Sequence, residues 1–172
     1  KVGTLESFNT DGLRSILFAM GHIPNMKEKT LRYPGHIDLM KSLIKAGFLN
    51  TEAIQYKGQS ISPLGFTSAL LFDQWKLGAT EAEFTLMTIE IKGEGKTIHY
   101  ELYDEYDAVT ETSSMSRTTG YTCTAALNML MENLFTEKGV FPPELVGKYA
   151  PCFEYIIKYL QERNIHYVKT ES

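Results

Sequence analysis

Hydrophobic residues recur three or four positions apart in several stretches of the chain, which is the period of a helix with one buried face. We predict helices over residues 13–20, 37–44, 63–75, 119–135 and 151–163. Gly21 and Gly47 follow the first two stretches as stop signals. Ser62 and Pro63 open the third, because serine suits the N-cap and proline suits the first helical position, where its missing N–H costs nothing.

Alternation between two faces, the pattern of a β-strand, is clearest in the middle of the chain. Residues 83–91 alternate in part, and residues 97–108 follow after the glycine-containing turn at residues 93–95. This arrangement predicts an antiparallel β-hairpin. Shorter extended segments are predicted at residues 30–33, 53–56 and 165–168. The sum is an α+β fold, in which helices pack on a mixed, partly antiparallel sheet.

Composition favours one globular domain over residues 1–172. The 172 residues are 43% hydrophobic and 22% charged, and no repeat or Pro- and Ser-rich linker divides them. No apolar run approaches about 18 residues, so we expect no membrane span. The net charge is −4 and the basic residues are scattered, which argues against a nucleic-acid partner because phosphate binding depends on clustered lysine and arginine.

The two cysteines, Cys123 and Cys152, each lie among apolar neighbours and lack a second cysteine or histidine at metal-ligand spacing. We predict two free, buried thiols and no metal site. Free thiols are typical of a reducing compartment, so we expect a cytoplasmic protein. The sequence starts at Lys1 without an initiator methionine or a signal segment, so we expect it to be a piece of a longer protein.

Residues 30–36 combine several features of an anion-binding site. Arg32 ends an extended segment, Gly35 permits close backbone approach, and a predicted helix starts directly afterwards. A guanidinium binds a carboxylate bidentately, and the free N–H groups of a helix start favour anions. In the alternative interpretation, Arg32 pairs with a neighbouring acidic residue and Pro34 with Gly35 forms only a turn.

Residues 114–121 place hydroxyl side chains and Arg117 just before a long apolar helix. The hydroxyls can cap this helix, and the arginine can meet an anion there. Plain capping would explain the serines and threonines but not Arg117. Similarly, Asn9, Thr10 and Asp11 are candidate N-caps of the first helix.

Common catalytic motifs are absent from the sequence. No Gly-x-Gly-x-x-Gly, Walker, His-Glu-x-x-His, Cys-x-x-Cys or Gly-x-Ser-x-Gly pattern occurs. The four histidines His22, His36, His99 and His166 are far apart in sequence. The two arginine segments therefore indicate recognition of a carboxylated small molecule, while the catalytic residue stays unknown.

Four stretches resemble the C-terminal domain of the saccharopine dehydrogenase family, which includes lysine 6-dehydrogenase. They are residues 5–14, 29–36, 115–121 and 139–144. The segments Leu-Arg-Tyr-Pro-Gly-His at 31–36 and Arg-Thr-Thr-Gly at 117–120 are the more specific ones. The stretches follow the order of the family and span most of the chain.

The resemblance implies a substrate-binding and dimerisation domain of the type found at the C-terminus of glyceraldehyde-3-phosphate dehydrogenase. In such enzymes an N-terminal Rossmann domain, which this chain lacks, binds NAD or NADP. The reaction oxidises an amine carbon to an imine by hydride transfer, or runs in reverse, on a lysine-like or saccharopine-like amino acid. We therefore expect a homodimeric fragment of a dehydrogenase that is not active alone.

The resemblance also implies a set of substrate contacts. At residues 9–12, saccharopine reductases have a sequence similar to Asn-Arg-Asp-Ser. This chain has Thr10 in place of the arginine and Gly12 in place of the serine, so it looks closer to the lysine-dehydrogenase-like branch. Asp11 or His36 could orient an amine or a water. The expected substrate-binding residues are Asn9, Thr10, Asp11, Arg32, Tyr33, His36, Arg117, Thr118 and Thr119.

Two other classes of function compete with this interpretation. The first is a non-catalytic module for amino-acid binding or oligomerisation, which fits the missing glycine fingerprint. A reading frame that starts near Lys1 would favour this module, whereas an upstream βαβ unit would favour the dehydrogenase. The second is a protein-interaction domain, supported only by Trp75 and ten tyrosines that suit core packing equally well.

Overall fold

The computed structural model describes residues 2–172, and the chain divides into two compact units, Lys1–Leu77 and Gly78–Ser172. Both units contain helices and antiparallel strands, which confirms the predicted α+β class. The assignment of residues 1–172 to one domain stays a prediction. Among the described residues, no helix combines the length and the apolar character needed to cross a membrane.

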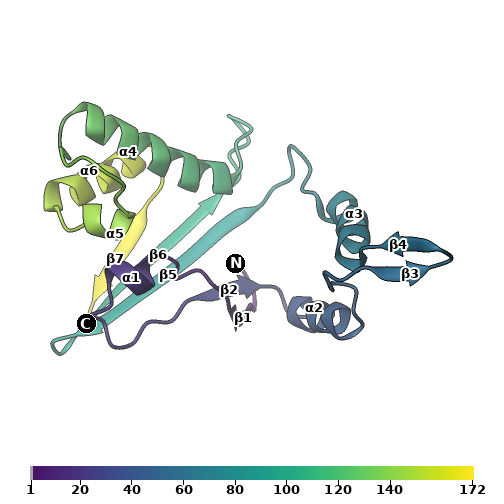
Figure 1. Cartoon of the computed structure of the whole chain (residues 1–172). Helices are drawn as coiled ribbons and strands as arrows, with labels where there is room; N and C mark the ends of the chain where they lie inside the picture. The colour runs from purple at the N-terminus through teal and green to yellow at the C-terminus, as the bar shows by residue number, and fades with distance from the viewer. Residues whose placement is uncertain (1) are drawn as a thin grey trace. The chain divides into compact units, whose positions relative to one another are not determined.

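Unit 1 contains two small two-stranded sheets and three helices (Figure 1). Its elements are β1 (Glu6–Asn9), α1 (Ile16–Ala19), β2 (Lys29–Arg32), α2 (His36–Lys45), β3 (Ile54–Tyr56), β4 (Gln59–Ile61) and α3 (Pro63–Trp75). β1 pairs with β2, and β3 pairs with β4, both antiparallel. Neither pair was predicted as a sheet, because only β2 and β3 were expected as extended segments and β1 and β4 were not.

The start of α3 agrees with the sequence. Ser62 is the N-cap, and its Oγ accepts a hydrogen bond from the backbone N–H of Gly65 at 3.1 Å. Pro63 occupies the first turn, as expected for a proline whose missing N–H would be unpaired in any case. Local capping chemistry was therefore sufficient to place this helix.

The predicted helix over residues 13–20 is confirmed over only half of its length. Only α1, Ile16–Ala19, is helical, and Ser15 rather than Asn9, Thr10 or Asp11 is its N-cap. Asn9 instead ends β1, where it lies opposite Lys29. Strand pairing provides the backbone of this segment with hydrogen-bond partners, and it therefore overrides the local capping preference.

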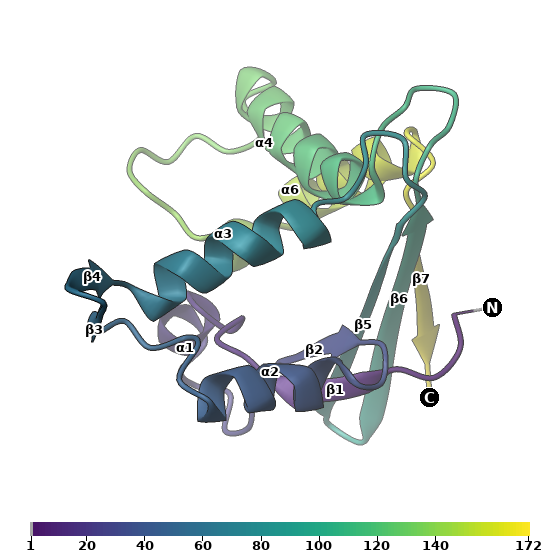
Figure 2. The same cartoon turned by 90° about the vertical axis from the view of Figure 1, so that its right-hand side faces the viewer.

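Unit 2 is built on a three-stranded antiparallel sheet in the order β5–β6–β7, with β6 in the centre (Figure 2). Its elements are β5 (Phe84–Gly93), β6 (Lys96–Glu105), η1 (Ser116–Gly120), α4 (Tyr121–Met131), α5 (Pro143–Val146), α6 (Ala150–Gln161) and β7 (Tyr167–Glu171). β5 and β6 form the predicted hairpin, with Glu94 and Gly95 in the turn. η1 is a π-helical turn that leads into α4.

Unit 2 also contains the buried hydrophobic residues of the described chain. One cluster joins the sheet to the end of α6, and a second lies between α4 and α6. Their buried members are Leu102, Leu160 and Ile165 in the first and Met129, Phe135 and Cys152 in the second. In unit 1, by contrast, Thr67 is the only buried residue among those described, at 5% exposure, and it donates to the Phe48 carbonyl.

Two further predictions need correction in unit 2. The helix predicted to reach Phe135 ends at Met131, because Asn133 adopts a left-handed conformation with φ of 57° and redirects the chain. This turn allows Phe135 to enter the second cluster. Cys152 is buried as predicted, whereas Cys123 is exposed on α4.

Candidate functional site

The predicted site residues fall into two groups, one in each unit. Unit 1 holds Asn9, Thr10, Asp11, Arg32, Tyr33 and His36, and unit 2 holds Arg117, Thr118 and Thr119. The two groups differ in how far their polar atoms are hydrogen-bonded or ion-paired to other residues of the chain.

In unit 1 the register of β1 with β2 defines one polar surface. Glu6 lies opposite Arg32 and Phe8 opposite Thr30, and opposite residues of an antiparallel pair share a face. The hydroxyls of Thr10 and Thr30 lie 3.0 Å apart, which extends this face past the strand end. We name this surface the β1–β2 face; its members are Glu6, Phe8, Thr10, Glu28, Thr30 and Arg32.

Asn9 belongs to the other side of the strand pair. Side chains alternate along a strand, so Asn9 and Lys29 lie on the face opposite to Thr10. Lys29 Nζ donates to Ser7 Oγ at 3.3 Å on this second face. The structure thus places Thr10 with Arg32 on one face and separates Asn9 from both.

Glu28 lies at one end of the β1–β2 face. Its Oε2 accepts hydrogen bonds from Thr10 Oγ1 and from the Gly12 N–H, the second at 3.3 Å. Thr30 Oγ1 lies 3.5 Å from the other oxygen, Oε1. A β-carbon added at Gly12 would lie 2.6 Å from Glu28 Cδ, so glycine leaves room for the carboxylate. Within residues 2–172 no basic side chain forms an ion pair with Glu28.

Aromatic side chains occupy the middle of the same surface. The His36 ring stacks on the Phe8 ring with centroids 6.2 Å apart. The same His36 ring also contacts the Trp75 ring, with centroids 6.3 Å apart. His36 is the first residue of α2, and Gly35 before it has φ of 99°, which glycine adopts without strain. Helix α2 therefore positions His36 beside the strand pair.

The N-terminus of α2 already has an acidic partner. Glu6 Oε1 accepts a hydrogen bond from the Ile37 N–H at 2.7 Å. A carboxylate at this position satisfies a backbone donor and complements the helix dipole. The predicted anion site at this helix start is thus occupied, at least at Ile37, by the chain's own Glu6.

Arg32 lies at the other end of the β1–β2 face from Glu28. It is exposed, and its Nη1 donates to the neighbouring Leu31 carbonyl at 2.7 Å. In the described part of the chain, no carboxylate lies within ion-pair distance of its guanidinium. The alternative in which Arg32 pairs with a neighbouring acidic residue is therefore not what the structure shows.

Tyr33 and Asp11 lie near this surface with different surroundings. Tyr33 follows Arg32 and is 55% exposed. Asp11 Oδ2 lies 3.5 Å from Arg14 Nη2, and both side chains are largely exposed to solvent. Such a surface pair contributes little to stability, so it restrains Asp11 only weakly.

In unit 2, Arg117 is buried among acceptors of its own chain. Its Nε lies 3.0 Å from Asp104 Oδ2, and its Nη1 lies 3.2 Å from Asp107 Oδ2. Nη2 donates to Asp104 Oδ1 and to the Arg163 carbonyl, each at 3.2 Å. The hydrogen bonds to Asp104, followed by the charges of Asp104 and Asp107, raise the pKa of Arg117 despite its burial. This guanidinium joins β6, η1 and the end of α6.

The two threonines after Arg117 also bond within the helix. Thr118 Oγ1 donates to the Ser114 carbonyl at 2.9 Å, and Thr119 Oγ1 donates to the Met115 carbonyl at 2.5 Å. They therefore do not cap the helix as predicted, since capping requires the hydroxyl oxygen to accept from a backbone N–H.

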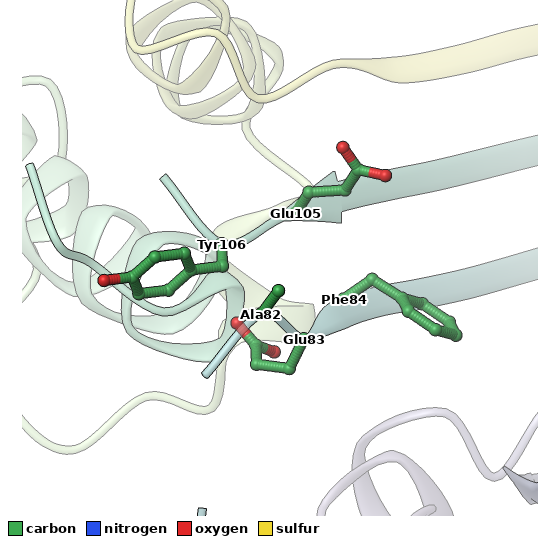
Figure 3. Close-up of a pocket in the computed structure, with 5 residues that line it drawn as sticks. All are labelled: Ala82, Glu83, Phe84, Glu105 and Tyr106. Carbon is green, nitrogen blue, oxygen red and sulfur yellow. The ribbon is translucent and has the colours of Figure 1, made fainter. Parts of the chain in front are cut away.

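A shallow pocket of about 250 Å³ lies where β5 begins and β6 ends (Figure 3). Ala82, Glu83, Phe84, Glu105 and Tyr106 line it. Glu83 accepts from the backbone N–H of Ser114 with one oxygen and from Ser114 Oγ with the other, the latter at 2.5 Å. Glu105 accepts from Tyr103 Oη at 2.5 Å. Because its carboxylates are already bonded within the chain, this pocket is a weaker candidate than the β1–β2 face.

Sequence reasoning missed Glu28, Glu6 and the two aspartates that hold Arg117. Glu28, Thr30 and Arg32 are spaced two residues apart, so an alternating pattern could have placed them on one strand face. Nothing in the sequence marks Asp104 and Asp107 as partners of Arg117. Among residues 2–172, no group of three histidine, cysteine, aspartate or glutamate side chains could hold a metal ion.

Comparison with known families assigns the chain to one of them. The model of the saccharopine dehydrogenase C-terminal domain matches residues 2–165. The chain therefore belongs to this family, and it is a domain of a saccharopine or lysine dehydrogenase-like enzyme. The family places the parent enzyme among the oxidoreductases of lysine metabolism and implies that it uses NAD or NADP.

Proposed function

We propose that this chain binds the amino-acid substrate of an NAD(P)-dependent oxidoreductase that acts on the CH–NH group of a lysine-like amino acid. One observation carries the proposal. Arg32 is an exposed guanidinium without a carboxylate partner in the described chain, and it lies on the same strand face as Phe8, whose ring stacks on that of His36.

The chemistry of this face suits an amino acid with an apolar stem. The guanidinium of Arg32 can accept a substrate carboxylate in two parallel hydrogen bonds. The rings of Phe8, His36 and Trp75 offer an apolar surface beside it. Thr10 and Tyr33 are the neighbouring polar groups, and no residue of this face is proposed as a catalytic residue.

Arg117, Thr118 and Thr119 enter the proposal in a different role. Their polar hydrogens are directed to acceptors of the chain itself, so we propose that they shape the start of α4 and do not bind the substrate directly. Asn9 lies on the strand face away from Arg32, and we propose no substrate contact for it.

The residues described here do not fit a dinucleotide. The only closely spaced glycine pair of residues 2–172, at positions 93 and 95, lies in the β5–β6 turn and does not precede a helix, whereas a pyrophosphate site requires a glycine-rich turn at a helix N-terminus. We therefore propose that an N-terminal Rossmann domain holds the cofactor, which supplies the hydride chemistry. The homodimer also stays a prediction.

The proposal is tested by titrating the 172-residue chain with L-lysine and following the fluorescence of Trp75, its single tryptophan. Arg32→Gln is expected to weaken binding by about ten- to a hundredfold, because charge-assisted hydrogen bonds to a carboxylate are lost. Arg14→Gln is the matched control, since Arg14 is also exposed but paired with Asp11, and this variant should bind as the unchanged chain does. Equal affinity of the Arg32 variant and this control would contradict the proposal.

A further inference from the structure

We propose that the Glu28 carboxylate selects the distal ammonium group of a lysine-like ligand whose carboxylate binds Arg32. This inference rests on the proposed function and extends it from amino acids in general to those with a cationic end. It assigns Glu28 as a specificity-determining residue, whereas the sequence had suggested Asp11 or His36, and not Glu28, for orienting an amine.

The hydrogen bonds around Glu28 leave one of its oxygens available. Thr10 Oγ1 and the Gly12 N–H both bond to Oε2, whereas Oε1 has only Thr30 Oγ1 at the limit of hydrogen-bond distance, 3.5 Å. A carboxylate offers about four acceptor positions, so Oε1 retains capacity for a further donor. The bonds to Oε2 hold the carboxylate in place before any ligand arrives.

The charge of Glu28 is not neutralised by the chain. Glu28 is partly buried, yet in the described residues it has no basic partner. The adjacent Lys29 lies on the opposite face of the strand, where it bonds to Ser7. A partly buried carboxylate without a counter-ion favours a cation from outside. The ammonium of a ligand can supply this charge.

The spacing along β2 matches a ligand that is charged at both ends. Glu28 and Arg32 are four residues apart on one face, which separates their backbones by about 13 Å. The long Arg32 side chain can reach inward and shorten this distance, while the Glu28 carboxylate keeps its bonds to Thr10 and Gly12. Phe8 lies between them, opposite Thr30, and the ring of His36 stacks on it; these rings suit the four-carbon stem of lysine. Along this face the Glu28 carboxylate, the aromatic rings and the Arg32 guanidinium follow one another. This order is complementary to the ammonium, the methylene stem and the carboxylate of lysine.

The test compares three amino acids on the 172-residue chain by Trp75 fluorescence and by calorimetry. L-Lysine has the distal ammonium, L-norleucine has the same stem without it, and L-2-aminoadipate has a carboxylate instead. We expect lysine to bind about tenfold more tightly than norleucine, and aminoadipate to bind most weakly. Glu28→Gln keeps the size of the side chain and should bring lysine and norleucine to within about twofold of each other.

A second variant tests placement without removing the charge. Gly12→Ala adds a methyl group that would lie 2.6 Å from Glu28 Cδ and so displaces the carboxylate. It should reduce the preference for lysine, although Glu28 is retained. Gly93→Ala is the matched control, because an added methyl group at Gly93 meets open space and the backbone there is not left-handed. It should leave the preference for lysine unchanged.

The outcomes separate this inference from the proposed function. If lysine and norleucine bind equally and both depend on Arg32, the role of Glu28 is overturned while the proposed function stands. If no amino acid binds, both fail together. If Glu28→Gln retains the full preference for lysine, another group recognises the ammonium and the inference is wrong.

Discussion

Glu28 in unit 1 and Glu83 in unit 2 are held by the same kinds of groups, a hydroxyl and a backbone N–H. At Glu83 both donors belong to Ser114, which is fully buried, and each donor bonds to a different carboxylate oxygen. At Glu28 both donors bond to one oxygen, in a more exposed setting. The Glu83 arrangement links the start of β5 to the segment before η1, and the Glu28 arrangement leaves one carboxylate oxygen able to accept a ligand.

The two motif arginines differ in the same way. Arg117 is 8% exposed and is bonded to Asp104, Asp107 and the Arg163 carbonyl. Arg32 is exposed and bonds only to the carbonyl of its neighbour Leu31 among the described residues. An arginine in a family-like motif can therefore serve the fold or the ligand, and its partners decide which.

The largest expected effect is on Arg117. Arg117→Ala leaves Asp104 buried without its partner, and we expect it to lower the free energy of unfolding by about 3–5 kcal/mol. Urea unfolding followed by circular dichroism measures this change. Arg32→Gln is the comparison and should shift the free energy of unfolding by less than about 0.5 kcal/mol. Equal losses in the two variants would contradict the division into a structural and a ligand-binding arginine.

The hydroxyl–glutamate pairs should differ by a smaller amount. Ser114→Ala removes the hydroxyl that donates to Glu83 and that lies 2.7 Å from Thr85 Oγ1. It should cost about 1–3 kcal/mol because a partly buried carboxylate oxygen loses its donor. Thr10→Ala acts at an exposed position, where water replaces the hydroxyl, and should cost less than about 1 kcal/mol. The same unfolding measurement on both variants tests the difference; a larger loss for Thr10→Ala would reverse it.

The smallest effect concerns the pH dependence of unit 2. Hydrogen bonds from the backbone N–H groups of Val109 and Thr110 and from the Thr110 side chain, and then the charge of the nearby Arg117, lower the pKa of Asp107. A lowered folded-state pKa stabilises the fold above the ordinary carboxyl pKa, and this contribution is lost as pH falls through the lower value. Below about pH 4 the urea midpoint of the unchanged chain should therefore fall more steeply than that of Asp107→Asn. Parallel curves for the two proteins would exclude this contribution.

Local signals determined several elements of this protein from the sequence alone. The alternation of residues 83–91 and 97–108 with glycines in the turn predicted the β5–β6 hairpin. Ser62 and Pro63 predicted the start of α3, and the Arg-Tyr-Pro-Gly-His segment led to Arg32 and His36. Each of these signals acts between residues close together in the chain, so the sequence displays it directly.

Tertiary structure decided which polar groups remain available. The pairing of β1 with β2 places Thr10 beside Glu28, and it separates Thr10 from Asn9. The folding of η1 against β6 buries Arg117 on Asp104. Strand register and charge burial depend on partners that are distant in sequence, and a one-residue change of register would reverse every face. For that physical reason the family and its arginines were visible in the sequence, whereas their different roles were not.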